Sequence, residues 1–253
     1  MLEFLSKTFI KFIYLISDKF NLQMTFHMLS LIMAGTLSVA DYVTEHVFSK
    51  SLRKNQKLVS FSSGVAVAYI ILRLFPEISS YALIDGRKVF LYALLGFVAL
   101  NLIEQYIYKG AGVLRAPSIP HKSAHVTYFF VYNFFIGMVL VNFAAKGLAQ
   151  TMLFFIPFLL YIIAEILPQE FEFKSHISKV LYSIAPFFGA LAGINFTTFT
   201  SSIFGEMISF ITGTLLYIVI RESLPSNEAE KPLFFIIGVL FYTLVIFMSW
   251  NFV

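Results

Sequence analysis

Residues 147–164 read GLAQTMLFFIPFLLYIIA, a run of 18 residues without Asp, Glu, Lys or Arg. A helix needs about 20 residues to cross the hydrocarbon core of a bilayer, so this run is close to the required length. It is apolar on every side, whereas strands of a membrane barrel alternate apolar and polar residues. The run therefore predicts a membrane-spanning helix.

The same pattern recurs along the chain. Hydrophobic residues make up 58% of the 253 positions and charged residues 13%, which leaves too little polar surface to cover a water-soluble globule. Seven further charge-free runs cover residues 20–40, 58–72, 89–103, 123–145, 180–205, 207–220 and 232–253. We therefore expect an all-α polytopic membrane protein with eight transmembrane helices and the lipid bilayer as its surroundings. The three shorter runs must extend past Arg73, Glu104 and Arg221 or Glu206, whose side chains can reach the interface.

The N-terminal segment has a different pattern. In residues 1–21, apolar residues recur at helical spacing and face away from Lys7, Lys11 and Asp18, which predicts an amphipathic helix lying in the membrane interface. No small-residue cleavage site follows it, so we do not expect a signal peptide. Residues 22–253 then form a single membrane domain.

The charges bear on orientation. The chain has no cysteine, which excludes a disulfide or a thiolate metal site, and its net charge of +4 is small. Connections after spans one, three and five carry nine Lys and Arg residues; the other face is assigned six, with Arg221 and Lys231 counted among them. Because cationic loops favour the cytoplasm, this distribution favours an N-terminus outside the cell.

Polar residues follow the opening run in EILPQE, residues 165–170. Glu165 and Gln169 are four residues apart and share a helix face, while Pro168 leaves the carbonyl of Ala164 without its usual donor. Together with Asn133 they offer oxygen ligands, which suit manganese or magnesium better than zinc. The alternative is that Asn133 and Gln169 hydrogen-bond between helices and that Glu165 is neutral.

Three stretches resemble spans of the ZIP (Zrt/Irt-like) metal transporters. SSGVAVAYIILRLFPE (62–77) resembles the second span, with Arg73 where His is usual; LLGFVALNLIEQ (94–105) resembles the third; FITGTLLYIVIRESLP (210–225) resembles the seventh. The resemblance implies a ZIP-like bundle of eight helices. It also implies a divalent metal ion as the transported substrate, with no resident cofactor.

The metal motifs of that family are altered here. YNFFIG (132–137) keeps Asn133 but has Tyr132 in place of the family's histidine, and EILPQE keeps Pro168 and Glu170. The implied metal ligands are Asn133, Glu165, Gln169 and Glu170, between spans four and five. Glu170 belongs to the set through the resemblance, although Lys174 follows it and favours an interfacial place for Glu170 and Glu172.

Other polar residues have simpler explanations. Arg73 either pairs with a carboxylate or extends to the interface, and we favour the interface. His121 and His125 are four apart in the third connection, but a pair without further ligands is a weak metal site. No nucleophile elbow, HExxH pair, P-loop or dinucleotide motif is present, so we do not expect an enzyme, and no basic and aromatic surface predicts nucleic-acid binding.

Three functions follow from the sequence. The first is transport of a divalent cation, the second a ZIP-like scaffold or regulator that has lost transport, and the third an intramembrane enzyme using Glu165. We expect spans two, four, five and seven to form the centre of the bundle, because they carry the small and polar residues, with spans three and six outside it. The oligomeric state is left open, with a homodimer as one alternative.

Overall fold

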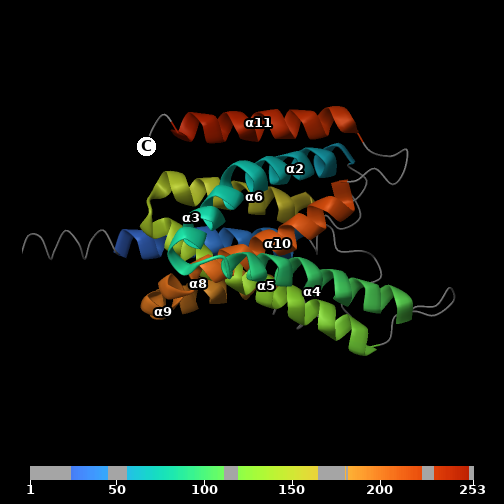
Figure 1. The fold of residues 1–253 in the computed structure, drawn as a ribbon, viewed down its shortest axis with the longest axis horizontal. Helices are drawn as coiled ribbons and strands as arrows, with labels where there is room; N and C mark the ends of the chain where they lie inside the picture. The colour runs from blue at the N-terminus through green and yellow to red at the C-terminus, as the bar shows by residue number, and fades with distance from the viewer. Residues whose placement is uncertain are drawn as a thin grey trace, which may run out of the picture.

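The structure is a computed structural model that describes residues 24–44, 56–110, 119–164, 180, 182–223 and 231–250. Every regular element within these ranges is a helix and none is a strand, which confirms the predicted all-α class. A helix over Met24–Val43 comes first. The labelled elements (Figure 1) are α2 (Gln56–Tyr69), the π-helical turn η3 (Ile70–Leu74), α3 (Phe75–Asp85), α4 (Val89–Gly110), α5 (Ile119–Ala145), α6 (Leu148–Ala164), α8 (Ala185–Asn195), α9 (Thr197–Ser202), α10 (Phe204–Ser223) and α11 (Pro232–Trp250).

Five helices are long and apolar enough to cross a membrane. They are Met24–Val43, Gln56–Asp85, Thr127–Ala145, Phe204–Arg221 and Pro232–Trp250. Three shorter apolar helices, Val89–Gln105, Leu148–Ala164 and Ala185–Asn195, lie between them. Each charge-free run of the sequence falls on one of these helices, so the described chain has the makeup of a multi-pass membrane protein.

The short runs do extend through charged residues, as predicted. Span two continues through Arg73, and α4 continues through Glu104. Glu104 is buried, and it forms an ion pair with Arg221 of α10 and accepts a hydrogen bond of 2.8 Å from the Tyr217 hydroxyl. Ion pairing between α4 and α10 therefore accommodates Glu104 and Arg221.

A close contact joins α5 to α8. Gly137 of α5 lies against the carbonyl oxygen of Pro186, and Gly189 of α8 lies against the carbonyl oxygen of Phe134. A Cβ atom at either glycine would overlap with the facing oxygen. Such spacing allows the backbones to touch and places Cα–H groups against carbonyls, the packing expected of small residues in membrane helices.

Two other helix pairs repeat this reciprocal contact, which we call the glycine clasp. In each pair, the oxygen that faces a glycine belongs to the residue three positions before the partner's glycine. The pairs are α2 with α11 (Gly64 and Gly238, against Phe235 and Phe61) and α4 with α10 (Gly96 and Gly213, against Phe210 and Ala93). The three clasps therefore join spans two and eight, three and seven, and four and six, in nested order.

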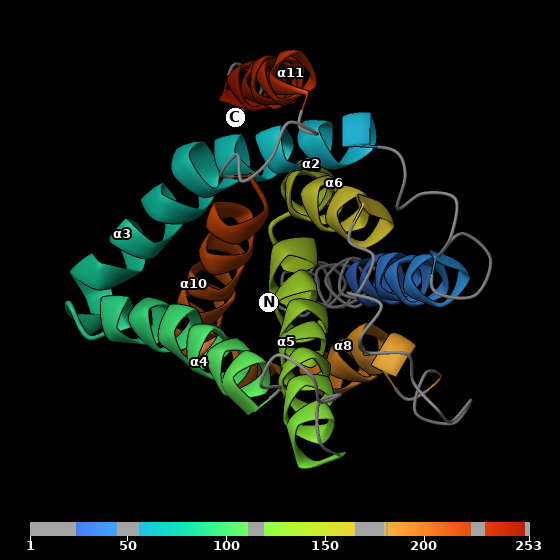
Figure 2. The same ribbon diagram turned by 90° about the vertical axis from the view of Figure 1, so that its right-hand side faces the viewer.

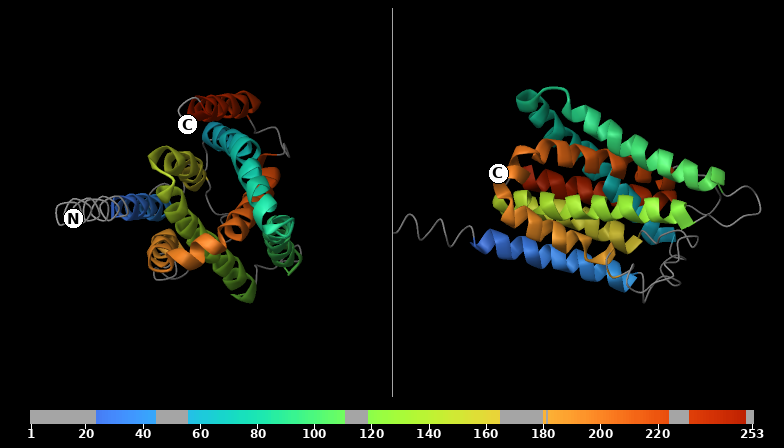
Figure 3. Two further views of the ribbon diagram at one scale, coloured as in Figure 1. Left: turned by 60° about the vertical axis from the view of Figure 1, so that its left-hand side comes forward. Right: turned by 90° about the horizontal axis from the view of Figure 1, so that it is seen from below.

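The paired helices surround a centre that the sequence predicted in part. In the most apolar stretch of α5 and of α10, 67% of the residues are buried, whereas in that of α11 only 17% are buried. Figure 2 and Figure 3 show α10 and α5 inside, with α11 on one edge and α4 on another. Exposed Leu91, Leu94 and Leu95 mark the outer face of α4. Spans four and seven are thus central, and span three is peripheral.

The helices end at two opposite ends of the bundle (Figure 1). We call end A the one with the α3–α4 turn at residues 86–88 and the α5–α6 turn at residues 146–147, and end B the one where α2 begins and α4 ends. The sequence-based assignment of Arg221 and Lys231 was wrong. Arg221 pairs with Glu104 near the end of α4, and the backbone N–H of Lys231 donates to Ser60 Oγ at 3.4 Å near the start of α2.

Both residues therefore lie at end B. The reason is that the connection after span seven must lie on the same side as those after spans one, three and five. If the chain crosses eight times, the count expected from the sequence becomes eleven cationic residues on that side against four on the other, with the N-terminal segment left aside. The correction strengthens the predicted orientation and does not reverse it.

Candidate functional site

Only Asn133 of the four sequence-predicted ligands lies in the described part of the chain. Its side chain is 5% exposed on α5 and makes no hydrogen bond to the other described residues. It precedes Gly137 by one turn on the same helix face, which packs on α8. Glu165, Gln169, Glu170 and Glu172 lie outside the described residues. The side chains of His121 and His125 are also outside the described part of the structure.

A small cavity lies beside the last described turn of α6. Its wall includes Ser62 and Ser63 of α2, Tyr161 and Ala164 of α6, and Val219 of α10, and it has room for about one water molecule. The Ser62 hydroxyl is buried there without a hydrogen bond from the described residues. Ala164 immediately precedes Glu165, the first residue of the predicted ligand segment, in the sequence.

An aromatic layer fills the bundle on the side of this cavity that faces end A. The ring of Tyr69 in α2 packs edge-on against Phe154 and Phe158 of α6 and Tyr242 of α11, with centroid distances of 6.5, 6.1 and 5.9 Å. All four side chains are fully buried. This part of the seam is therefore apolar and closely packed.

Tyr242 also donates a hydrogen bond to a backbone carbonyl that a proline leaves without a donor. Pro157 lies inside α6 and has no N–H, so the carbonyl of Leu153, four residues earlier, lacks its helical donor. The Tyr242 hydroxyl donates to that carbonyl at 2.6 Å. The hydrogen bond ties α11 to the interruption in α6, where backbone would otherwise be left unsatisfied away from water.

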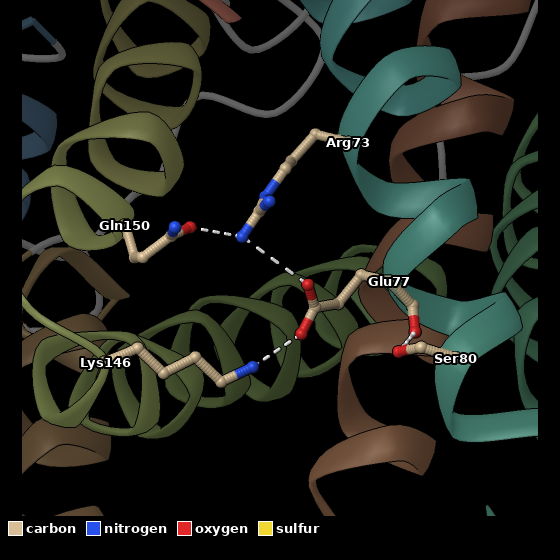
Figure 4. A network of polar contacts seen from close by, with 5 residues as sticks. All are labelled: Arg73, Glu77, Ser80, Lys146 and Gln150. Atoms are coloured by element: carbon tan, nitrogen blue, oxygen red, sulfur yellow. Dashed lines mark hydrogen bonds and ion pairs between the residues drawn. The ribbon is translucent and has the colours of Figure 1, made fainter. Parts of the chain in front are cut away.

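An ion cluster lies beyond the aromatic layer, toward end A (Figure 4). The Arg73 Nη2 atom bonds Gln150 Oε1 and lies 3.5 Å from Glu77 Oε2. Lys146 Nζ lies 2.5 Å from Glu77 Oε1. Arg73 therefore pairs with a carboxylate, the alternative that the sequence analysis did not favour, and its side chain remains 20% exposed.

Aromatic rings fix Lys146 in this cluster. Its ammonium lies 4.9 Å from the centroid of Phe204, 5.3 Å from that of Phe143 and 5.7 Å from that of Tyr81. Cation–π attraction to several rings holds the ammonium group in place beside Glu77. Lys146 is thus positioned to neutralise Glu77.

These features form one continuous contact between two antiparallel helices, which we call the α2–α6 seam. On span two, residues 62, 66, 69, 73 and 77 follow each other at intervals of three or four, and on α6 residues 150, 154, 158 and 161 do the same. The seam is polar at both ends and aromatic in the middle. Helical spacing could have revealed each stripe, but only the structure shows that the two stripes face each other.

The described residues contain no group of three or more His, Cys, Asp or Glu side chains able to hold a metal ion. Further ion pairs between described residues reach α10. Glu104 of α4 pairs with Arg221 at end B, and Lys88, in the turn before α4, lies 3.7 Å from Glu206 at end A. Comparison of the chain with protein-family models, curated proteins and solved structures finds no match.

Proposed function

We propose that the chain is an eight-span membrane transporter that moves a divalent cation, with its N-terminus outside the cell. Asn133, Glu165, Gln169 and Glu170 are the proposed ligands, and they enter the proposal from the sequence. The observation that carries it is the small cavity at the seam, because the buried Ser62 hydroxyl, which has no hydrogen-bond partner among the described residues, lines it together with Ala164, the residue that precedes Glu165. Carboxylate, amide and hydroxyl oxygens are ligands for hard divalent cations.

The α2–α6 seam also supports the proposal that the path is closed toward end A in this conformation. Toward end A, the cavity is followed by the aromatic layer and then by the Arg73, Glu77 and Lys146 cluster. A cation that reached the cavity from end B would meet a dry barrier and two positive charges in this conformation. Transport across such a barrier requires that the seam open at end A, as in alternating access.

The test is metal uptake by liposomes that contain the purified protein. Zinc, iron, manganese, cobalt and cadmium are each supplied outside, and the initial rate is compared with that of protein-free liposomes. We expect at least one of these ions to enter faster in the presence of the protein. Rates equal to those of protein-free liposomes for all five ions would reject transport of a divalent transition metal.

One observation favours a second candidate function, that of a membrane scaffold or regulator without transport. The centre of the seam is filled by rings, and the cavity is no larger than a water molecule. In this case the polar residues serve packing between helices, and the aromatic layer never opens. The two functions differ in one measurable property, namely whether substitutions in the aromatic layer change solute flux.

A further inference from the structure

The aromatic layer of the seam contains a polar group that lacks a partner. Tyr69 is 0% exposed, and its hydroxyl makes no hydrogen bond with the described residues. A hydroxyl that is removed from water without gaining a partner destabilises the state in which it is buried. The closed layer therefore carries a cost, which disappears in a conformation that lets water reach Tyr69.

Tyr242 provides the comparison, because it lies in the same layer and its hydroxyl has a partner. Its side chain is also fully buried, and its ring centroid lies 5.9 Å from that of Tyr69. The Tyr242 hydroxyl donates to the Leu153 carbonyl, whereas the Tyr69 hydroxyl has no acceptor in the described part of the chain. Of the two tyrosines, Tyr69 is therefore the one that gains a hydrogen bond when water enters the layer.

The backbone next to Tyr69 departs from a regular α-helix. Tyr69 directly precedes η3, where the Phe75 N–H donates to the carbonyl of Ile70, five residues earlier. Such π-helical turns are frequent at functional sites, and they are places where a helix bends while its backbone stays hydrogen-bonded. Span two is therefore able to change its shape directly beside the buried tyrosine.

Contacts on the other side of η3 hold span two against the start of α6 at end A. Glu77 pairs with Lys146 at 2.5 Å, and Arg73 bonds Gln150 (Figure 4). Both cations are partly exposed, Lys146 to 38% and Arg73 to 20%. Ion pairs that water can reach contribute little net stability, because water replaces each partner when they separate. The ion cluster therefore closes end A with contacts that can be exchanged for water.

We infer that Tyr69 is the gate of the α2–α6 seam and that η3 is its hinge. The layer opens on the side of end A when η3 bends and the ion cluster separates, and water then reaches the Tyr69 hydroxyl. The inference rests on the proposed function for the solute that passes, but the opening is measured without any solute. A scaffold whose aromatic layer never opens is incompatible with it.

The experiment follows a thiol placed behind the gate in the full chain, which has no cysteine of its own. Ala66 lies one turn before Tyr69, is 2% exposed and lines the seam cavity, so the thiol of Ala66→Cys reacts when the bundle opens. Leu83→Cys, on α3, is the control for reagent reactivity, because Leu83 is 90% exposed. The rate of modification by a small methanethiosulfonate is measured for both thiols in neutral detergent.

Tyr69→Phe and Tyr242→Phe are matched variants, because each removes one hydroxyl from the layer and keeps the ring. We expect Tyr69→Phe to slow the modification of Ala66→Cys about tenfold, since the closed layer loses its unpartnered hydroxyl. Tyr242→Phe should leave this rate equal or raise it, because the closed layer then loses a hydrogen bond. In thermal unfolding, Tyr69→Phe should match or exceed the wild-type midpoint, and Tyr242→Phe should fall below it.

A rate for Ala66→Cys that Tyr69→Phe leaves unchanged or raises would overturn the inference, as would equal slowing by both phenylalanine variants. Ser62→Cys lines the same cavity and replaces Ala66→Cys if that variant does not fold. Uptake by liposomes separates this inference from the proposed function. Opening that depends on Tyr69 without uptake would keep the gate and reject transport, whereas uptake with a modification rate independent of Tyr69 would reject the gate alone.

Discussion

Tyr242 shows how a single hydroxyl can compensate for a proline. Pro157 removes a donor from α6, and the hydroxyl of Tyr242 supplies another to the exposed Leu153 carbonyl. Sequence reasoning attended to Pro168 and overlooked Pro157, which has the same effect on the residue four positions earlier. The donor itself could not be found from the sequence, because Tyr242 lies 89 residues away from Leu153.

This arrangement makes a prediction that a double-mutant cycle can test. Tyr242→Phe removes the donor and should lower the free energy of unfolding by about 1 kcal/mol. Pro157→Ala restores an N–H to α6, so the same Tyr242 substitution should cost less in that background. Thermal unfolding in detergent gives the four values. An equal loss in both backgrounds would show that the hydroxyl does not act through the Leu153 carbonyl.

Glu104 and Arg221 are a second case at the residue scale. The side chain of Glu104 is 9% exposed and that of Arg221 is 35% exposed. Removing the arginine therefore leaves the more deeply buried charge without its ion partner. Arg221→Gln should therefore destabilise the chain more than Glu104→Gln does, and the double variant should recover part of the loss. Unfolding midpoints in low and high salt provide the comparison. A double variant as unstable as the sum of both single variants would mean that the pair contributes nothing.

At the scale of elements, the sequence predicted the helices well and their pairing poorly. Charge-free runs located the five long and three shorter apolar helices of the described chain, because a bilayer tolerates few charges in a span. Most glycine clasps have a recognisable sequence pattern, in which Phe lies three residues before Gly: FSSG, FFIG, FITG and FIIG. The sequence does not show which of these segments pack against each other, because that is set by the tertiary structure. Two clasp segments, ALLG and PFFG, do not have Phe at this position.

The clasps predict opposite effects for two kinds of glycine. Gly137→Ala places a methyl group against the Pro186 carbonyl and should destabilise the chain by about 1–3 kcal/mol. Gly35→Ala is the matched control, because its Cβ would meet only a Phe187 ring atom at 3.9 Å. Alanine also has the higher helix propensity, so this change should leave stability equal or raise it by up to about 1 kcal/mol. Equal destabilisation by both substitutions, followed by thermal unfolding, would contradict close packing at Gly137.

At the scale of the whole molecule, the sequence predicted an all-α membrane protein, but it identified only some of the polar residues that lie inside the bundle. Asn133 was identified and is buried. The seam was not identified, because Arg73 and Gln150 lie 77 positions apart and no local pattern shows that they meet. The end at which each connection lies follows from the crossings alone, and the structure corrected Arg221 and Lys231 accordingly.

The absence of cysteine makes the topology directly measurable. Arg87→Cys at end A and Lys231→Cys at end B each introduce one exposed thiol. With eight crossings and end B inside, a membrane-impermeant thiol reagent should label Arg87→Cys on intact cells and label Lys231→Cys only after permeabilisation. Labelling of both thiols on intact cells would contradict the proposed arrangement.

The central claim, a cation path that begins beside the seam cavity, is tested most directly by one rate. It is the initial uptake rate of the preferred ion by liposomes that contain Glu165→Gln, relative to wild type and to Glu172→Gln. The account predicts that Glu165→Gln falls to the protein-free rate. Glu172→Gln, which changes a residue that the sequence predicts to be interfacial, should keep the wild-type rate. Wild-type uptake by correctly folded Glu165→Gln would contradict the account.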